Sequence, residues 1–264
     1  MFWPFNVNFK KQKLSMVCFD FDNTLCDYAQ AEAETEVHII SIIYKDILKN
    51  LKSKTKHSTI SQQDLLKNFN AIKNSHLQAD LDPKGFSRKM WLDELFRAIH
   101  NTYKIDVSKL IAKSKDYEKE YWRFFNNVVK LYSNTIYTLD YLKSSGLKIA
   151  LVTNSDGERP IKLNRVKHLK LDKYFDYIIT SDDTKLNKPD PAVWNLLIKE
   201  SGINPKECMM VGDHPDIDLA SAKKLGMITV WTKQHISFDL RSKYVDYEIS
   251  DIQEVCNIVK NFSR

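Results

Sequence analysis

Residues 16–24 read MVCFDFDNT, and this stretch decides the fold of the chain. Its first four residues are apolar and rich in strand formers, so they predict a strand buried on both faces of a parallel sheet. Asp20 and Asp22 follow, two positions apart and therefore on the same side of an extended backbone. Two like charges beside a core are unfavourable unless a metal ion, a cationic partner or a shared proton compensates them. A helix-capping turn would account for one of these acids only.

The composition is that of an ordinary soluble globular protein, and its 264 residues suffice for one large domain or two modest ones. The net charge of +6 suits anionic partners but is too small to demand nucleic acid, so we expect no nucleic-acid partner. The four cysteines have neither a metal-binding spacing nor a disulfide framework, which favours a reducing cytoplasm. No apolar run approaches the ~18 residues of a membrane span, so no membrane partner is expected.

Between residues 28 and 134 the apolar residues recur at helical spacing, and no buried strand is predicted. We expect four helices, with apolar stripes at about 37–51, 65–72, 90–99 and 110–131. Residues 28–135 hold 18 Lys and Arg against 13 Asp and Glu, so most of the positive excess lies in this insert. The aromatic segment at residues 1–9 does not have the order of a signal peptide and is expected to pack as an arm on the surface.

One loop inside the insert, at residues 80–88, contains the insert's only proline and only glycine, Pro83 and Gly85. It is either a plain connection between two helices or a shaped loop that carries Lys84 and Arg88 towards a ligand. Both interpretations remain open at this point.

After residue 135, strands and helices alternate, which predicts βαβ units and a parallel sheet covered on both faces. Strands are expected at residues 148–152, 177–180, 208–211, 227–231 and 247–249, and helices at 136–144, after Pro160, at 192–201 and at 218–225. The chain is therefore expected to be an α/β protein. Residues 1–27 and 135–264 would form the core, and residues 28–134 an inserted all-α domain.

Polar side chains follow three of these strands. Asp20, Thr153 and Asp213 come directly after a strand, and Lys188 lies in a loop before a helix. Because the carboxyl ends of parallel strands share the edge where ligands bind, we expect these side chains to meet. Asp20 could act as a carboxylate nucleophile, and Asp20 with Asp213 could hold Mg²⁺.

The neighbouring residues suit the chemistry of a phosphate ester. Thr153 and the amide of Asn154 can donate hydrogen bonds to phosphate oxygens, and Lys188 supplies a point cation. Asp22 lies beside other carboxylates, which is expected to favour its protonated form. A protonated acid near a leaving oxygen is a general acid.

The set of motifs resembles the four motifs of the haloacid dehalogenase superfamily, and of its phosphatases in particular. The matching positions are Asp20-x-Asp22-x-Thr24, Thr153, Lys188-Pro189-Asp190-Pro191, and Gly212-Asp213 with Asp218. The resemblance covers residues 15–27 and 135–232. It implies a Rossmann-like core, and the helical insert resembles the C1-type cap of that family in architecture.

The resemblance also implies roles for single residues. Asp20 would be the nucleophile that forms an aspartyl-phosphate. Asp22 would be the acid and then the base that activates water, while Thr24 would brace the loop. Thr153 and Asn154 would bind the phosphoryl group.

For the metal, the resemblance implies that Mg²⁺ is held by Asp20, Asp213 and the main-chain carbonyl of Asp22. Asp218 would act on it through a water molecule or through the other ligands. Lys188 would orient Asp20 and neutralise charge.

We therefore expect a Mg²⁺-dependent hydrolase that acts on a small soluble phosphate ester, since a helical cap closing over the sheet would exclude macromolecules. One alternative is a dehalogenase or phosphonatase of the same superfamily, but members of those kinds lack an acid at the position of Asp22. Another alternative is a binding protein with a retired site. Such a protein would tolerate the loss of Asp20, Lys188 or Asp213, yet all three are present.

Overall fold

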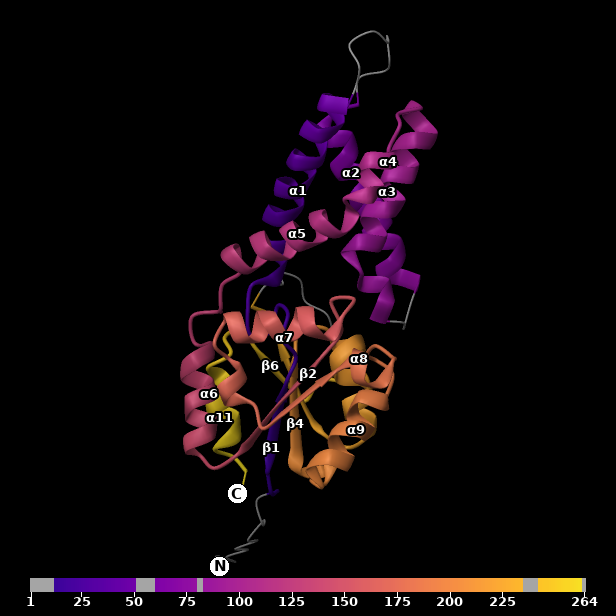
Figure 1. The fold of residues 1–264 in the computed structure, drawn as a ribbon. Helices are drawn as coiled ribbons and strands as arrows, with labels where there is room; N and C mark the ends of the chain where they lie inside the picture. The colour runs from indigo at the N-terminus through magenta and orange to yellow at the C-terminus, as the bar shows by residue number, and fades with distance from the viewer. Residues whose placement is uncertain (1–11, 51–59, 80–82, 235–241, 263–264) are drawn as a thin grey trace, which may run out of the picture.

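The computed structural model describes residues 12–50, 60–79, 83–234 and 242–262 (Figure 1). Six strands form one parallel sheet in the order β3-β2-β1-β4-β5-β6. The strands are β1 (Met16–Phe19), β2 (Lys148–Thr153), β3 (Tyr177–Thr180), β4 (Cys208–Gly212), β5 (Ile228–Thr232) and β6 (Tyr247–Ile249). The expected α/β fold with a parallel sheet is confirmed, and the apolar run after residue 15 lies at its centre. The predicted aromatic arm lies outside the described residues.

Strand β1 occupies the middle of the sheet because its residues are buried on both faces. Val17 pairs with Ile149 of β2 on one side and with Met209 of β4 on the other. The chain runs outward from β1 to β3 and then crosses to β4, so the strand order reverses between β1 and β4. In open sheets of this kind, ligands bind outside the carboxyl ends of the strands at such a point.

Helices cover both faces of the sheet (Figure 1). Alternate residues of β1 point to opposite faces, as the period of a strand requires. Val17 and Phe19 join the apolar cluster that includes α6 (Thr135–Ser144), α7 (Arg159–His168) and α11 (Glu254–Val259). Met16 and Cys18 join the cluster that includes α9 (Ala192–Ser201) and α10 (Ala220–Lys224). Four shorter elements also belong to the core: η2 (Asp172–Tyr174), α8 (Ser181–Thr184), η3 (Pro205–Glu207) and η4 (Pro215–Leu219).

A helical insert, residues 28–128, stands over the carboxyl edge of the sheet (Figure 1). It consists of α1 (Tyr28–Asn50), α2 (Gln62–Ala79), η1 (Pro83–Phe86), α3 (Arg88–Tyr103), α4 (Ser108–Ala112) and α5 (Ser114–Val128). The fourth predicted stripe is therefore two helices, because the backbone at Lys113 leaves helical geometry at φ −98° and ψ 2°. Among the described residues, no helix has the length and apolar character needed to cross a membrane.

From Pro83 onwards, local hydrogen bonds fix the loop that contains the insert's proline and glycine. Pro83–Phe86 forms a 3₁₀ turn, and the Ser87 side chain caps α3 by accepting a hydrogen bond from the Met90 backbone N–H at 3.4 Å. The Trp91 indole N–H donates to the Gly85 carbonyl at 2.8 Å. Residues 80–82 of the predicted loop lie outside the described residues. The described part is a shaped turn that fixes where α3 begins.

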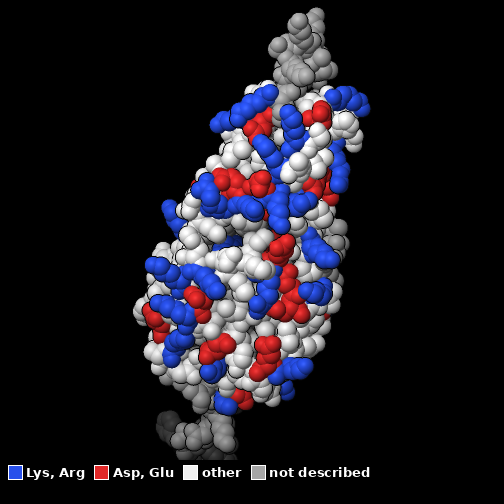
Figure 2. All heavy atoms as spheres, viewed as in Figure 1, with Lys and Arg blue, Asp and Glu red and all other residues white. Residues whose placement is uncertain are grey.

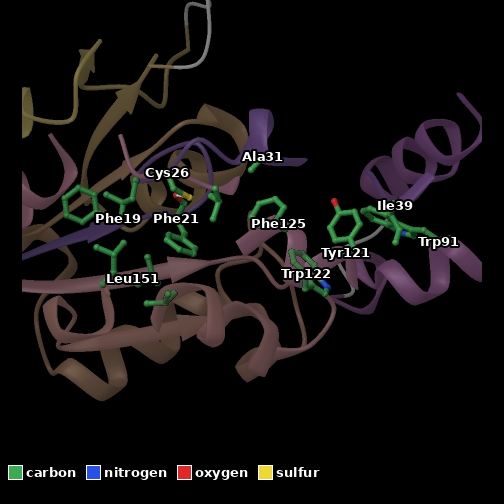
Figure 3. Packing of buried hydrophobic residues seen from close by; sticks show 14 of the residues in the cluster. Phe19, Phe21, Cys26, Ala31, Ile39, Trp91, Tyr121, Trp122, Phe125 and Leu151 are labelled. Atoms are coloured by element: carbon green, nitrogen blue, oxygen red, sulfur yellow. Dashed lines mark hydrogen bonds between the residues drawn. The ribbon is translucent and has the colours of Figure 1, made fainter. Parts of the chain in front are cut away.

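The apolar core continues from the sheet into the insert (Figure 3). Phe19 ends strand β1 and Phe21 follows it, and the packing then continues through Phe125 and Trp122 of α5 to Trp91 of α3. Rings of Trp122 and Phe125 lie edge to face with centroids 5.5 Å apart. This continuous packing fixes the insert above the sheet, since a gap would forfeit contacts on both sides.

Candidate active site

The site begins with Asp20, the residue that directly follows β1. Its backbone N–H donates to the Val211 carbonyl of β4 at 2.9 Å, so the sheet ladder continues as far as this residue. The side chain is 8% exposed and lies at the edge where the strand order reverses. Asp20 is therefore held on rigid backbone at the carboxyl end of the sheet.

Lys188 lies against Asp20 and is almost completely buried. Its Nζ donates to Asp20 Oδ1 at 2.6 Å, to Asp218 Oδ1 at 2.7 Å and to the Val152 carbonyl at 3.0 Å. Burial by itself would lower the pKa of Lys188, but Asp20 and Asp218 raise it above its ordinary value. Lys188 is therefore a fixed, charged ammonium group between two carboxylates.

Three carboxylates gather around this ammonium group. Asp20, Asp213 and Asp218 each offer an oxygen that lies within 4.8 Å of the other two. Burial and the neighbouring carboxylates raise the pKa of Asp20 to about 7, against the lowering effect of Lys188. Burial and the carboxylates of Asp218 and Asp20 raise the pKa of Asp213 well above its ordinary value. With all three acids ionised, the cluster would carry more negative charge than one ammonium group balances, so a bound cation would favour the ionised forms.

A divalent cation fits this cluster on the chemistry of its donors. Mg²⁺ prefers oxygen ligands and usually takes one or two carboxylates together with water. Gly212 permits the arrangement, because a Cβ there would lie 2.6 Å from both Cβ and Oδ2 of Asp218. The helix expected at residues 218–225 starts earlier, as the π-helical turn η4, and the His214 N–H donates to Asp218 Oδ2 at 2.9 Å. The turn thereby directs Asp218 inward.

The loop after β2 forms the side of the site suited to phosphate oxygens. The Asn154 side-chain oxygen accepts a hydrogen bond from the Lys188 backbone N–H at 2.8 Å, so its amide nitrogen can donate to a ligand. The Ser155 backbone N–H donates to Ser181 Oγ at 2.8 Å, and Ser155 Oγ donates to Asp182 Oδ2 at 2.7 Å. These bonds hold the loop rigid, and Thr153 and Asn154 both line the cavity described below.

Asp22 has other partners than the sequence suggested. Lys162 Nζ lies 2.6 Å from Asp22 Oδ2, and Arg165 Nη1 lies 2.6 Å from Asp22 Oδ1. Both cations also contact Asp156, at 3.0 Å from Lys162 and 2.8 Å from Arg165. We call Asp22, Asp156, Lys162 and Arg165 the α7 clamp. Its two cations and two anions are matched in number.

The expectation that Asp22 is protonated is wrong here. Burial would raise the pKa of Asp22, but Arg165 and Lys162 together hold the pKa below its ordinary value. The sequence argument counted only the nearby carboxylates, whereas two cations of α7 contact this side chain directly. Asp22 is thus an ionised carboxylate that lines the cavity beside Asp20.

A cavity of about 240 Å³ lies between the sheet edge and the insert. The sheet side contributes the residues described above, including Asp20, Asp22, Thr153, Asn154, Lys188, Asp213 and Asp218. The insert side contributes Tyr28, Glu32, Leu77, Phe86, Arg88 and Trp91. The site is therefore lined by side chains from two parts of the chain that are far apart in sequence.

The structure separates the two basic residues that the sequence placed together in the insert loop. Arg88 lines the cavity, whereas Lys84 lines a second groove with Lys89, Arg97 and Glu158.

Thr24 is fully buried beneath the loop and is not part of the cavity wall. Asp183 caps α8 through Thr180, with a backbone hydrogen bond of 2.8 Å.

Sequence reasoning identified Asp22 and Arg88 but missed the partners of Asp22 in the α7 clamp and the rest of the insert wall. Lys162 and Arg165 are three residues apart and therefore share a face of α7, which was a usable signal because this helix follows the loop of Thr153. Glu32 and Tyr28 carried no comparable signal. They belong to the first turns of a long helix in which polar residues are ordinarily solvated.

Comparison with known proteins agrees with this geometry. Residues 17–232 match the haloacid dehalogenase-like hydrolases. The chain is 32% identical over 184 residues to a glyceraldehyde 3-phosphate phosphatase of Methanocaldococcus jannaschii, which covers 69% of this chain and 76% of that protein. It is 26% identical over 186 residues to pyrophosphatase PpaX of Bacillus cereus, which covers 69% and 84% respectively.

Solved structures share the fold at lower sequence identity. A phosphatase from Thermococcus onnurineus superposes with a TM-score of 0.69 at 22% identity, over 94% of this chain and 99% of that one. A 2-haloacid dehalogenase from Pseudomonas syringae gives 0.69 at 20% identity, over 94% and 98%. At these identities the solved structures show the fold alone. The family assignment rests on the match over residues 17–232 and on the relative that is 32% identical. The chain therefore belongs to the haloacid dehalogenase-like hydrolases, as a phosphatase-type member of that family.

Proposed function

We propose that this protein is a Mg²⁺-dependent phosphomonoester hydrolase that acts on a small phosphorylated metabolite through an aspartyl-phosphate on Asp20. One observation carries the proposal. The Asp20 carboxylate is buried, oriented by Lys188 and grouped with Asp213 and Asp218 in the cavity between the sheet edge and the insert. The four cysteines are free and buried, which supports a reducing compartment such as the cytoplasm.

In the first step an Asp20 oxygen attacks phosphorus, and the bond from phosphorus to the ester oxygen breaks. The leaving oxygen departs with the electron pair of that bond and takes up a proton from solvent water. Lys188 neutralises charge on the nucleophile, while Thr153 and Asn154 donate hydrogen bonds to the phosphoryl oxygens. Fixed donors of this kind stabilise developing charge because they need no reorientation during the reaction.

In the second step water attacks phosphorus, and the bond to Asp20 breaks to release phosphate and restore the carboxylate. Asp22 stands two residues from Asp20 and is ionised, so it can accept the proton of that water. Donation of a proton to the leaving oxygen in the first step would require Asp22 to be protonated and to leave the α7 clamp.

The metal would be held by Asp20 and Asp213 with the main-chain carbonyl of Asp22, and Asp218 would lie close to it. Bound Mg²⁺ would offset the negative charge of the carboxylates and of the phosphoryl group. Burial and the neighbouring carboxylates raise the pKa values of Asp20 and Asp213, and a bound cation would offset both effects by stabilising the ionised forms.

The alternatives explain less of this site. A phosphonatase that forms a Schiff base needs an uncharged lysine amine, yet Lys188 is a buried ammonium group bonded to Asp20 and Asp218. Within the described part of the chain, the insert contributes no lysine to the cavity wall. A dehalogenase would leave Asp22 without a role. The third alternative is a binding protein that has lost its activity. The assay described next distinguishes it from an active enzyme.

The test is the hydrolysis of nitrophenyl phosphate with and without Mg²⁺, followed by a panel of metabolite phosphates. Glyceraldehyde 3-phosphate and pyrophosphate belong in the panel because relatives are named for them. Asp20→Asn should lower kcat at least ~10³-fold, as removal of a nucleophile commonly does. The fold should be retained, which circular dichroism checks. A variant with a tenth of the wild-type activity would contradict the covalent mechanism.

A further inference from the structure

The insert wall of the cavity contains one acidic and one basic side chain that contact each other. Arg88 Nη2 donates to Glu32 Oε1 at 3.0 Å and also contacts the Tyr28 hydroxyl, while Arg88 Nη1 donates to the Phe86 carbonyl at 2.8 Å. The guanidinium lies against the rings of Trp91 and Trp122, with its central carbon 4.2 and 4.8 Å from their centroids. Arg88 is therefore held in one position.

The charge of this pair is balanced inside the insert. Glu32 Oε2 also accepts a hydrogen bond from Lys73 Nζ at 3.1 Å, and Lys73 in turn contacts Glu36. Two cations thus face two anions in this network. A carboxylate on a bound substrate would meet Glu32 directly and would find Arg88 already paired, so its loss of hydration would be poorly compensated.

An uncharged hydroxyl group meets a more favourable partner. Arg88 is only 1% exposed and its hydrogen bonds go to Glu32, the Tyr28 hydroxyl and the Phe86 carbonyl, so it fixes the position of Glu32 from behind. Glu32 presents a carboxylate to the same cavity. A hydroxyl group can donate a hydrogen bond to this carboxylate, whereas an ionised carboxylate has no proton to donate. The apolar side chains of Leu77, Phe86 and Trp91 limit the space around it.

We propose that Glu32, held in place by Arg88, reads the leaving group of the substrate, and that it selects small uncharged hydroxyl-bearing phosphate esters over esters that carry a carboxylate. This inference rests on the proposed phosphatase function. It specifies the substrate class of the same site, because the sheet side accounts for the phosphoryl group and the insert side for the remainder.

A matched pair of substrates tests the selection. Glycerol 3-phosphate and 3-phosphoglycerate have the same number of carbons and a phosphate on a primary carbon, and they differ in CH₂OH against a carboxylate. We expect kcat/KM to favour glycerol 3-phosphate by at least ~10-fold, since polar groups left unpaired in a site discriminate strongly. Equal kcat/KM values for the two esters in the wild-type enzyme would overturn the proposal.

Glu32→Gln keeps the size of the side chain and removes its negative charge, which leaves the Arg88 charge uncompensated. The preference should fall by ~10-fold or more, because KM for 3-phosphoglycerate decreases. Glu120→Gln is the matched control, since Glu120 pairs with Arg123 and His38 elsewhere in the insert and is not in the cavity wall. A wild-type preference in Glu32→Gln, or a lost preference in Glu120→Gln, contradicts the assignment.

Two further measurements keep the outcomes distinct. Thermal unfolding shows whether Glu32→Gln is folded, and if it is not, Glu32→Asp is used. That variant keeps the charge but withdraws the carboxylate, so KM for glycerol 3-phosphate should rise while that for 3-phosphoglycerate does not fall. Unchanged KM values would overturn the assignment. Nitrophenyl phosphate reports on the sheet side alone, and its lack of hydrolysis by the wild-type enzyme would contradict the phosphatase function instead.

Discussion

At the scale of single residues, the Asp22 carboxylate is ionised and forms ion pairs with Lys162 and Arg165. Arg165 reaches it from α7, and the guanidinium carbon of Arg165 also lies 4.9 Å from the Phe21 ring and 5.1 Å from the Phe125 ring. Arg165 therefore contacts both the loop after β1 and the insert helix α5. The carboxylate two positions after the nucleophile is fixed by the same residue that packs against the insert.

Replacing Asp22 by Asn should slow the second step of the reaction most, since the variant lacks the base that accepts a proton from water. We expect a loss of ~10²–10⁴-fold in steady-state kcat. Rapid mixing with nitrophenyl phosphate should still show a burst of nitrophenol, because Asp20 remains able to attack. Asp156 still pairs with Lys162 and Arg165 in this variant, so the fold should survive. Wild-type turnover without a burst would count against the role of Asp22.

At the scale of elements, the loop after β2 touches the insert where α3 begins. Gly157 has a φ of +99°, and a Cβ built there would lie 2.7 Å from the Ser87 Cα and 3.0 Å from its nitrogen. Any residue other than glycine is therefore unfavourable at this position for two reasons: the positive φ angle and the close contact with the Ser87 backbone. This approach of two backbones sets how closely the insert wall lies over Thr153 and Asn154.

Gly157→Ala should displace the start of α3 and lower kcat/KM, because a shift of about 1 Å in a positioned site can cost about 10²-fold. The matched control is Gly202→Ala, whose φ is +66° and whose added Cβ would meet nothing within 4 Å. Both variants should lose about 1–3 kcal/mol of unfolding free energy from backbone strain. Only Gly157→Ala should lose activity. Equal kcat/KM values for the two variants would mean that the contact with Ser87 does not position the site.

At the scale of the whole molecule, the sheet and the insert share one apolar core and enclose a charged site between them (Figure 3). Lys and Arg side chains are spread over the visible face of the insert with acidic side chains among them, and they do not form a patch of one sign there (Figure 2). At the sheet edge, by contrast, three carboxylates gather around the single ammonium group of Lys188. A cation that binds this cluster should stabilise the entire fold.

Mg²⁺ should raise the temperature of unfolding measured by calorimetry, because a ligand that binds only the folded state adds about 2.7 kcal/mol at a hundred times its Kd. Asp213→Asn should abolish this shift without unfolding the protein. Chelation should stop turnover, and Mg²⁺ but not Ca²⁺ should restore it, since Ca²⁺ takes a looser and larger coordination shell. Full turnover in excess chelator, or an equal shift in the variant, would argue against the assigned metal site.

The sequence by itself determined the class of fold and the edge at which the site lies. The apolar run before Asp20 and the alternation after residue 135 are local patterns, and the geometry of parallel strands brings Asp20, Thr153 and Asp213 to one edge. The residues brought together there needed no tertiary information beyond that topology.

Only the tertiary structure decided the charge of Asp22 and the composition of the insert wall. The pairing of Asp22 with Lys162 and Arg165, and of Glu32 with Arg88, joins residues that are 56 to 143 positions apart. Periodicity reports which face of a helix is apolar, but it holds no information on which distant side chain lies opposite. The ionisation of a buried group depends on those neighbours, so it follows from the packed structure rather than from any local pattern.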